Sequence, residues 1–229
     1  MHDTSGIEQT IGVSFHRKDI LIEALTHRSY LNENPSWELP HNERLEFLGD
    51  AVLELVVTEN LYATYPLLDE GKLTNVRAAL VNYVSLSKVA RAIKLEDALL
   101  MSRGEAKDTG RARDVILANA CEALLGALYL DHGYEAAATF IKKHILILAD
   151  DIVVNQSFKD AKSYFQELAQ EKHKVTPTYK VLEATGPDHN KTFVVGVFLK
   201  DKKIAEGKGY SKQEAETEAA KNGLQAMGE

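Results

Sequence analysis

The sequence predicts a larger all-α domain followed by a smaller α+β domain with the order α-β-β-β-α. From Ile7 to about Asp151, apolar residues recur at intervals of three and four, as they do on one face of a helix. After residue 159 the pattern changes to one helical segment, three segments of strand-like alternation and a last helix. We therefore expect a first domain at 1–152, a linker at 153–159 and a second domain at 160–229.

The two predicted domains also differ in charge. Divided at residue 157, the chain has 15 Lys and Arg against 23 Asp and Glu before the division, and 12 Lys, no Arg and 11 Asp and Glu after it. The net charges are −8 and +1, although the whole chain carries −7. An acidic first domain is suited to holding cations, and a lysine-bearing second domain is suited to meeting phosphates.

Composition excludes several classes of protein. With 45% hydrophobic and 27% charged residues, the chain is neither disordered nor fibrous. The single cysteine, Cys121, excludes an intramolecular disulfide framework and a multi-cysteine zinc site, and it fits a reducing compartment. The first residues lack a basic start followed by an apolar run, and we find no segment typical of a membrane span. We expect a cytoplasmic protein with no membrane partner.

The individual elements follow from periodicity and from breaks such as those at Pro35, Pro66 and Gly133. In the first domain we expect helices at Asp19–Thr26, Asn42–Tyr65, Lys72–Ile93, Ala112–Leu130 and Tyr134–Ile152. In the second domain we expect a helix at Ala161–Gln170, strands at Thr178–Thr185, Lys191–Lys200 and Lys203–Tyr210, and a helix at Lys212–Met227.

The segment HNERLEFLGDAVLELVV (41–57) carries acids on one helical face. At about 100° per residue, Glu43, Glu46 and Asp50 fall within about 60° of one another. Like charges at these spacings destabilise a helix unless a cation binds between them, and oxygen ligands suit Mg²⁺. A solvated acidic stripe is the alternative interpretation, and this segment alone does not decide between the two.

A second helix, DVILANACEALLGALYLDHG (114–133), is apolar almost all round except at Asn119 and Glu122. Because an unpaired buried carboxylate is unfavourable, this polar pair needs partners. Either a shared metal ion or hydrogen bonds within the core satisfy that need. Cys121 faces away from the pair and is expected to pack in the core.

These residues resemble bacterial ribonuclease III. NERLEFLGD at 42–50 matches the signature motif of that family, and ALTHRS (24–29), LTNVRAALV (73–81) and EALLGALYLD (122–131) match its other helices in order. The resemblance covers nearly the whole chain. It implies an endonuclease that hydrolyses phosphodiester bonds of double-stranded RNA with Mg²⁺, for which Mn²⁺ can substitute.

The resemblance also implies roles for the acids. Asp50, Glu122 and Glu43 become the catalytic acids, with Glu43 lying toward the RNA. The metal ligands are Glu46, Asn119, Glu122 and Asp50. Glu70 matches a further acidic position of less settled role, and a plain surface acid is the alternative there. His27 and His41 are expected to have structural or capping roles.

Asn119 departs from the family pattern, which has Asp at this position. An amide oxygen can still bind Mg²⁺ but brings no charge, so we expect weaker metal affinity with activity retained. The alternative is a catalytically weakened double-stranded RNA-binding scaffold or regulator, for which Asn119 is the only support. An all-α structural protein without RNA would leave the second domain unexplained.

The second domain resembles a double-stranded RNA-binding domain, through KSYFQE (162–167), PTY (177–179), GPDHNKTF (186–193) and the run from Gly207 to Ala220. The implied RNA contacts are Ser163, Gln166, His189, Ser211 and Lys212. They would reach 2′-hydroxyls, base edges and phosphates of A-form RNA. Because Gln213 stands where a further basic residue is common, we expect modest affinity and a shallow salt dependence.

One acid cluster per chain can cut one strand, so cleavage of both strands implies a homodimer related by a two-fold axis. Apolar surface of the signature helix and of the helix around Leu73–Leu86 is the expected interface. The resemblance implies staggered products with 5′-phosphate and 3′-hydroxyl ends, and ribosomal RNA precursors and structured messenger RNAs as substrates.

Overall fold

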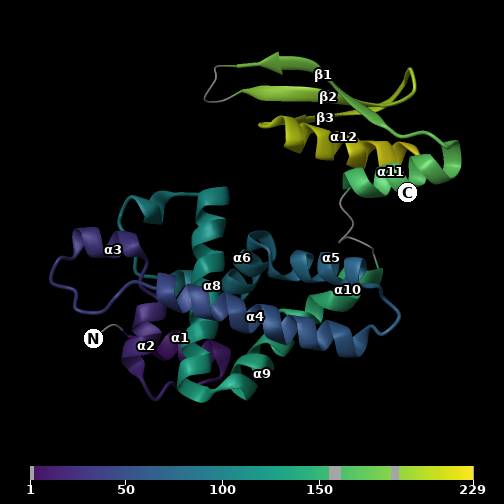
Figure 1. The fold of residues 1–229 in the computed structure, drawn as a ribbon. Helices are drawn as coiled ribbons and strands as arrows, with labels where there is room; N and C mark the ends of the chain where they lie inside the picture. Colours follow the sequence, from purple (N-terminus) through teal and green to yellow (C-terminus); the bar gives the residue numbers. More distant parts are fainter. Residues whose placement is uncertain (1–2, 155–160, 187–190, 229) are drawn as a thin grey trace. The chain divides into compact units, whose positions relative to one another are not determined.

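The computed structural model describes residues 3–154, 161–186 and 191–228. The chain divides into two compact units, Met1–Phe158 and Lys159–Glu229 (Figure 1). Each unit has its own cluster of buried apolar residues. The first unit is helical and the second contains the three-stranded sheet, in agreement with the expected fold class.

The helices of the first unit are joined by short loops and two 3₁₀ turns. They are α1 (Ser5–Ile11), α2 (Lys18–Ala24), α3 (Arg28–Glu33), α4 (Glu43–Thr64), α5 (Glu70–Val81), α6 (Tyr83–Ala92), α7 (Leu95–Ala98), α8 (Arg111–His132), α9 (Tyr134–His144) and α10 (Ala149–Val154), with 3₁₀ turns η1 (Glu105–Lys107) and η2 (Leu146–Leu148).

Helix α8 forms the centre of the first unit, and α2, α4, α6 and α9 pack against it. The buried residues in its middle are almost all Ala, Leu or Gly. Among the described residues it is also the one helix long and apolar enough to cross a membrane, whereas the sequence analysis found no segment typical of a membrane span. Because 61% of the apolar stretch of α8 is buried inside the unit, the hydrophobicity of this helix is that of a core helix.

Two of the expected helices are interrupted, so their predicted continuity was wrong. The helix expected at Lys72–Ile93 breaks at Asn82, whose side chain accepts a 2.9 Å hydrogen bond from the Ser85 amide and caps α6. The helix expected at Tyr134–Ile152 ends at His144 and continues through η2 into α10. Helix α10 reaches Val154, and residues 155–159 of the expected linker lie outside the described residues.

Buried contacts hold the start of α4 against the end of α2. The backbone nitrogen of Asn42 donates to the carbonyl oxygen of Thr26 at 2.9 Å. The side-chain amide of Asn42 donates to the carbonyl oxygen of Ala24 at 3.3 Å. Asn42 is only 3% exposed. These bonds set the position at which the acidic face of α4 begins.

The second unit is an antiparallel sheet with two helices on one face (Figure 1). Its elements are α11 (Ala161–His173), β1 (Thr178–Thr185), β2 (Thr192–Leu199), β3 (Lys202–Gly209) and α12 (Lys212–Ala226). The strands pair in the order β1-β2-β3. Phe165 of α11 and Val197 of β2 are fully buried between the sheet and the helices.

Glycines let α12 pack directly on β3. A Cβ atom on Gly207 would lie 2.1 Å from the Ala219 nitrogen, and one on Gly209 would lie 2.6 Å from the Ala215 nitrogen. Real Cβ atoms do not approach so closely, so only glycine permits this spacing between strand and helix. The packing determines where the amino terminus of α12 lies within the unit.

Candidate functional site

Helix α4 presents three acids on one side, as its 3.6-residue period predicts. Glu46 is half-buried, whereas Glu43 and Asp50 are exposed. Leu53 and Val57 lie seven residues beyond Glu46 and Asp50 on the same side of the helix, and both are completely buried in the core. The fold therefore holds this acidic face on a rigid support.

Helix α8 crosses α4 at a pair of glycines (Figure 1). A Cβ atom on Gly49 would lie 1.7 Å from the carbonyl oxygen of Glu122, and one on Gly126 would lie 2.2 Å from the carbonyl oxygen of Leu45. The backbones are thus in direct contact at the crossing. This contact brings Glu122 of α8 beside Glu46 and Asp50 of α4.

The electrostatics of this acid cluster are unfavourable without a cation. Burial raises the pKa of Glu122 to about 8, and the negative charges of Asp50 and Glu46 contribute to the rise. Burial also raises the pKa of Glu46, assisted by the charges of Glu43 and Asp50. Burial is thus the larger cause of both pKa shifts, and repulsion among carboxylates from the two crossing helices adds to it.

Asn119 lies in the same cluster. Its side chain hydrogen-bonds to the Glu46 carboxylate, and this bond acts to lower the pKa of Glu46 against the effect of burial. Glu46, Asp50, Glu122 and Asn119 thus converge from two crossing helices. Three carboxylates and one amide oxygen are a donor set suited to Mg²⁺ or Mn²⁺, so the residues present fit such an ion.

Glu43 lies at the outer edge of the cluster. Its carboxylate is 3.4 Å from the Arg28 guanidinium and 3.8 Å from Nδ1 of His41. His27 caps α3, since its Nδ1 accepts a hydrogen bond from the Ser29 amide. The capping role expected for His27 is confirmed.

Glu70 lies apart from the other acids within one chain. It is the first residue of α5 and is exposed beside Leu61 and Tyr62, near the end of α4. Leu61 is 15 residues beyond Glu46 on the same helix, about 22 Å along its axis. A single chain does not bring Glu70 to the acid cluster, although the sequence groups it with the acids.

Cys121 is completely buried and has no disulfide. Burial, and then the nearby charge of Glu122, raise the pKa of its thiol to about 12. A thiol with this pKa stays protonated at neutral pH and is unreactive. The expected core role of Cys121 is confirmed.

The candidate RNA-contacting residues of the second unit lie on exposed surfaces. Ser163 and Gln166 are three residues apart on α11, so they share a face, and both are exposed. Lys212 is exposed in the first turn of α12. Ser211 is the N-cap of α12, and its hydroxyl oxygen accepts a 3.1 Å bond from the Glu214 amide. His189 lies outside the described residues.

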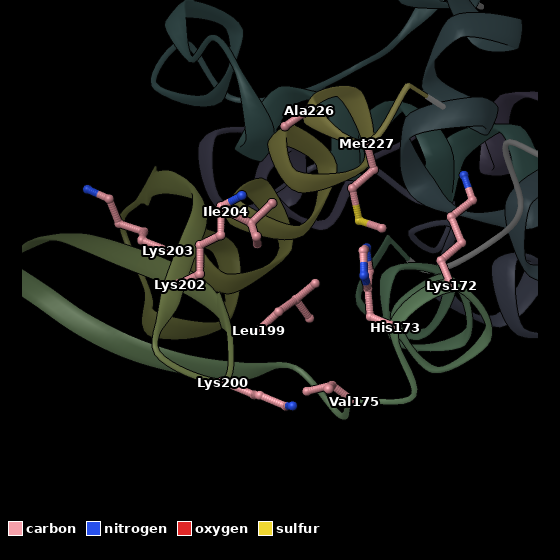
Figure 2. Close-up of a pocket in the computed structure, with 10 residues that line it drawn as sticks. All are labelled: Lys172, His173, Val175, Leu199, Lys200, Lys202, Lys203, Ile204, Ala226 and Met227. Carbon is pink, nitrogen blue, oxygen red and sulfur yellow. The ribbon is translucent and has the colours of Figure 1, made fainter.

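A cavity of about 590 Å³ lies beside Ala226 and Met227 at the carboxyl end of α12 (Figure 2). Lys212 is the first residue of that helix, at its amino end. Leu199 of β2, Ile204 of β3 and Met227, the residue after α12, are among the apolar side chains that line the cavity. Lysines surround it: Lys172, Lys200, Lys202 and Lys203. The sequence analysis placed Lys200 and Lys203 at the ends of strands and assigned these lysines no function. The three lysines within residues 200–203 were the available signal.

Comparison with known proteins agrees with this geometry. Residues 17–149 match the family model described as ribonuclease-III-like, and residues 161–227 match the double-stranded RNA binding motif. The first match contains both acid-bearing helices, and the second contains the sheet with its two helices.

Similar proteins extend over nearly the whole chain. Ribonuclease 3 of Desulforamulus reducens is 46% identical, covering 96% of this chain and 90% of that protein. Ribonuclease 3 of Myxococcus xanthus is 43% identical, covering 97% and 86%.

A solved nuclease domain of ribonuclease III from Campylobacter jejuni superposes with a TM-score of 0.57 at 41% identity. That superposition covers 63% of this chain and 97% of that one. The chain therefore belongs to the ribonuclease III family of metal-dependent endoribonucleases, with a double-stranded RNA-binding motif after its nuclease domain.

Proposed function

We propose that the chain hydrolyses phosphodiester bonds of double-stranded RNA with Mg²⁺ as the metal ion. The observation that carries this proposal is the convergence of Glu46, Asp50 and Glu122 at the crossing of α4 and α8, with the pKa of Glu122 raised to about 8. Carboxylates held this close repel one another, and a fold retains such a cluster where a bound cation offsets the repulsion. No serine or cysteine nucleophile is needed.

Glu46, Asp50 and Glu122 would hold the metal with their carboxylates, and Asn119 would add its amide oxygen. When bound, Mg²⁺ supplies Lewis-acid stabilisation of the charge on the phosphate and lowers the pKa of an attacking water. Glu122 must lose its proton to act as a ligand. Glu43, at the exposed edge of the cluster, would lie toward the RNA.

The second unit would hold the duplex. Ser163 and Gln166 on α11 would bond to 2′-hydroxyls and base edges in a minor groove, and Lys212 would meet phosphates beside the positive end of α12. Ser211 would donate its hydroxyl hydrogen to a phosphate, because its hydroxyl oxygen already accepts the hydrogen bond that caps α12. His189 is proposed as a contact in the next minor groove.

Two copies of the chain would act together, one for each strand. Phe47 and Tyr62 of α4 are 81% and 78% exposed, and Tyr83 and Val84 at the start of α6 are exposed as well. Exposed aromatic residues of this kind mark association surfaces. The Campylobacter jejuni structure is described as flexible in a region involved in dimer formation, which supports the same assembly here.

Hydrolysis by two such sites would give staggered ends with 5′-phosphate and 3′-hydroxyl groups. The proposed substrates are ribosomal RNA precursors and structured messenger RNAs. The proposed location is the cytoplasm, which suits a chain whose single cysteine is buried and unpaired.

Cleavage of a long RNA duplex, with and without Mg²⁺, tests this function. We expect the full chain to cut the duplex but not single-stranded RNA, and the Glu122→Gln variant to lose cutting by more than 100-fold. Glu135→Gln removes an exposed acid of the same unit and serves as the matched control. Binding without cutting by the unaltered chain, in either Mg²⁺ or Mn²⁺, would reject the nuclease in favour of an RNA-binding scaffold.

A further inference from the structure

A second cluster of possible metal ligands lies away from the acids. It consists of His16, in the segment before α2, and Asp131 and His132, at the end of α8. Asp131 is nine residues beyond Glu122 on the same helix, about 14 Å along the axis. The two clusters are therefore separate sites.

The carboxylate of Asp131 is the fixed centre of this cluster. Its side chain is 2% exposed, and it accepts hydrogen bonds from the backbone amides of His16 at 2.8 Å and Arg17 at 3.1 Å. Burial acts to raise the pKa of Asp131, but these two amides, followed by His132 and His16, lower it overall. Asp131 is thus an anion held in one orientation.

Both imidazoles approach the same carboxylate oxygen. Nδ1 of His16 is 3.4 Å and Nε2 of His132 is 3.1 Å from Oδ2 of Asp131. Nε2 of His132 is also 3.1 Å from the carbonyl oxygen of Ser14. Nε2 of His132 therefore faces two oxygen atoms at once. Either a proton or a metal ion bound to Nε2 would interact favourably with both oxygens.

These separations match those of a tetrahedral metal site. With metal–ligand bonds of about 2.0–2.1 Å, ligand atoms of a tetrahedral Zn²⁺ site lie about 3.3–3.4 Å apart. The ligand atoms of the three residues all lie within 4.8 Å of one another. The side chain of His16 is 76% exposed and that of His132 is 20% exposed, and the centroids of their rings lie 4.7 Å apart.

The ligand types select a different metal from that of the acid cluster. Two imidazoles and one carboxylate favour Zn²⁺ and neighbouring transition metals, while carboxylate and amide oxygens favour Mg²⁺. We propose that His16, Asp131 and His132 bind one Zn²⁺ ion that fastens the segment Ser14–Arg17 to the end of α8. The Ser14 carbonyl oxygen or a water completes the coordination.

The test is metal binding by the full chain, freed of any histidine tag and treated with a chelator. Zn²⁺ affinity and the Zn²⁺-dependent rise in Tm are measured for the unaltered chain, His16→Gln and His132→Gln. We expect each variant to weaken binding by at least tenfold and to remove the rise in Tm. Mg²⁺ should give no rise that depends on these histidines.

Matched controls separate this site from others. The amide introduced by His132→Gln can still donate to the Ser14 carbonyl, so we expect this variant to keep the fold while losing the imidazole ligand. His173→Gln removes an exposed histidine of the second unit and should behave like the unaltered chain. The acid cluster is present in every variant, so a difference between variants reports on the histidines alone.

Co²⁺ provides a direct readout of geometry. The unaltered chain should give the strong visible absorption of tetrahedral Co²⁺, and both histidine variants should lose it. Equal Zn²⁺ affinity in all the chains, or histidine variants that lower Tm equally with and without Zn²⁺, would overturn the proposal. The cluster would then be a hydrogen-bonded clamp without a metal.

Discussion

A methyl group on Gly49 would lie 1.7 Å from the backbone carbonyl oxygen of Glu122. This contact sets the separation of α4 and α8, and with it the positions of the carboxylates that both helices carry. The site therefore depends on a residue that has no side chain and takes no part in the chemistry.

Gly49→Ala should damage both stability and activity. The added methyl group pushes α8 away from α4, so we expect unfolding to become easier by about 1–3 kcal/mol. Duplex cleavage should fall about 100-fold, because displacing catalytic groups by about 1 Å has effects of that size. Urea denaturation and initial cleavage rates measure the two effects.

Gly6→Ala is the matched control, since a Cβ atom on Gly6 in α1 would meet nothing within 4 Å. Its stability should change by less than about 1 kcal/mol. If Gly49→Ala resembles this control, the close crossing is not what positions the acids.

Asn119→Asp should lower the Mg²⁺ concentration needed for half-maximal cleavage by about three- to tenfold, because it adds a charged ligand to the cluster. It also replaces an amide that hydrogen-bonds to Glu46 with a negative charge. The metal-free variant should therefore be less stable than the unaltered chain at pH 8. If the Mg²⁺ concentration needed for half-maximal cleavage is the same in the variant and the unaltered chain, Asn119 does not limit metal affinity.

Glu122 makes the stability of the metal-free protein depend on pH. Its pKa is about 8 in the folded protein against a usual value of 4.5, so the folded state holds this proton more tightly than the unfolded chain. The stabilisation is complete below about pH 4.5 and is lost as the pH rises to 8. Because Glu122 is partly exposed to solvent, we expect a change of about 1–2 kcal/mol.

Denaturation in the presence of a chelator at pH 5, 6.5 and 8 measures this effect. Relative to the unaltered chain, Glu122→Gln should gain stability as the pH rises, and Glu135→Gln should not. Parallel pH profiles for all three proteins would mean that Glu122 titrates normally.

Lys212→Ala should weaken duplex binding several-fold and reduce the slope of log affinity against log salt by about one, as expected for one lost phosphate contact. Lys202→Ala, at the rim of the lysine-lined cavity, is the control and should change neither quantity. The unaltered chain should itself show a shallow slope. Equal effects of the two substitutions would indicate a diffuse positive field instead of a defined contact.

Local pattern in the sequence was enough to predict the helical first unit, the α-β-β-β-α second unit and the shared face of Glu43, Glu46 and Asp50. These features repeat with the period of a single helix or strand, so neighbouring residues determine them. The break at Asn82 was missed because its capping bond competes with an apolar period that continues through it.

Contacts between distant segments were decided only by the tertiary structure. It determined that Gly49 meets Glu122, that Glu70 lies away from the other acids of its own chain, and that His16 meets Asp131. These relationships depend on how closely helices pack and where they cross. Packing of that kind reflects the shapes of many side chains together, which no local period in the sequence records.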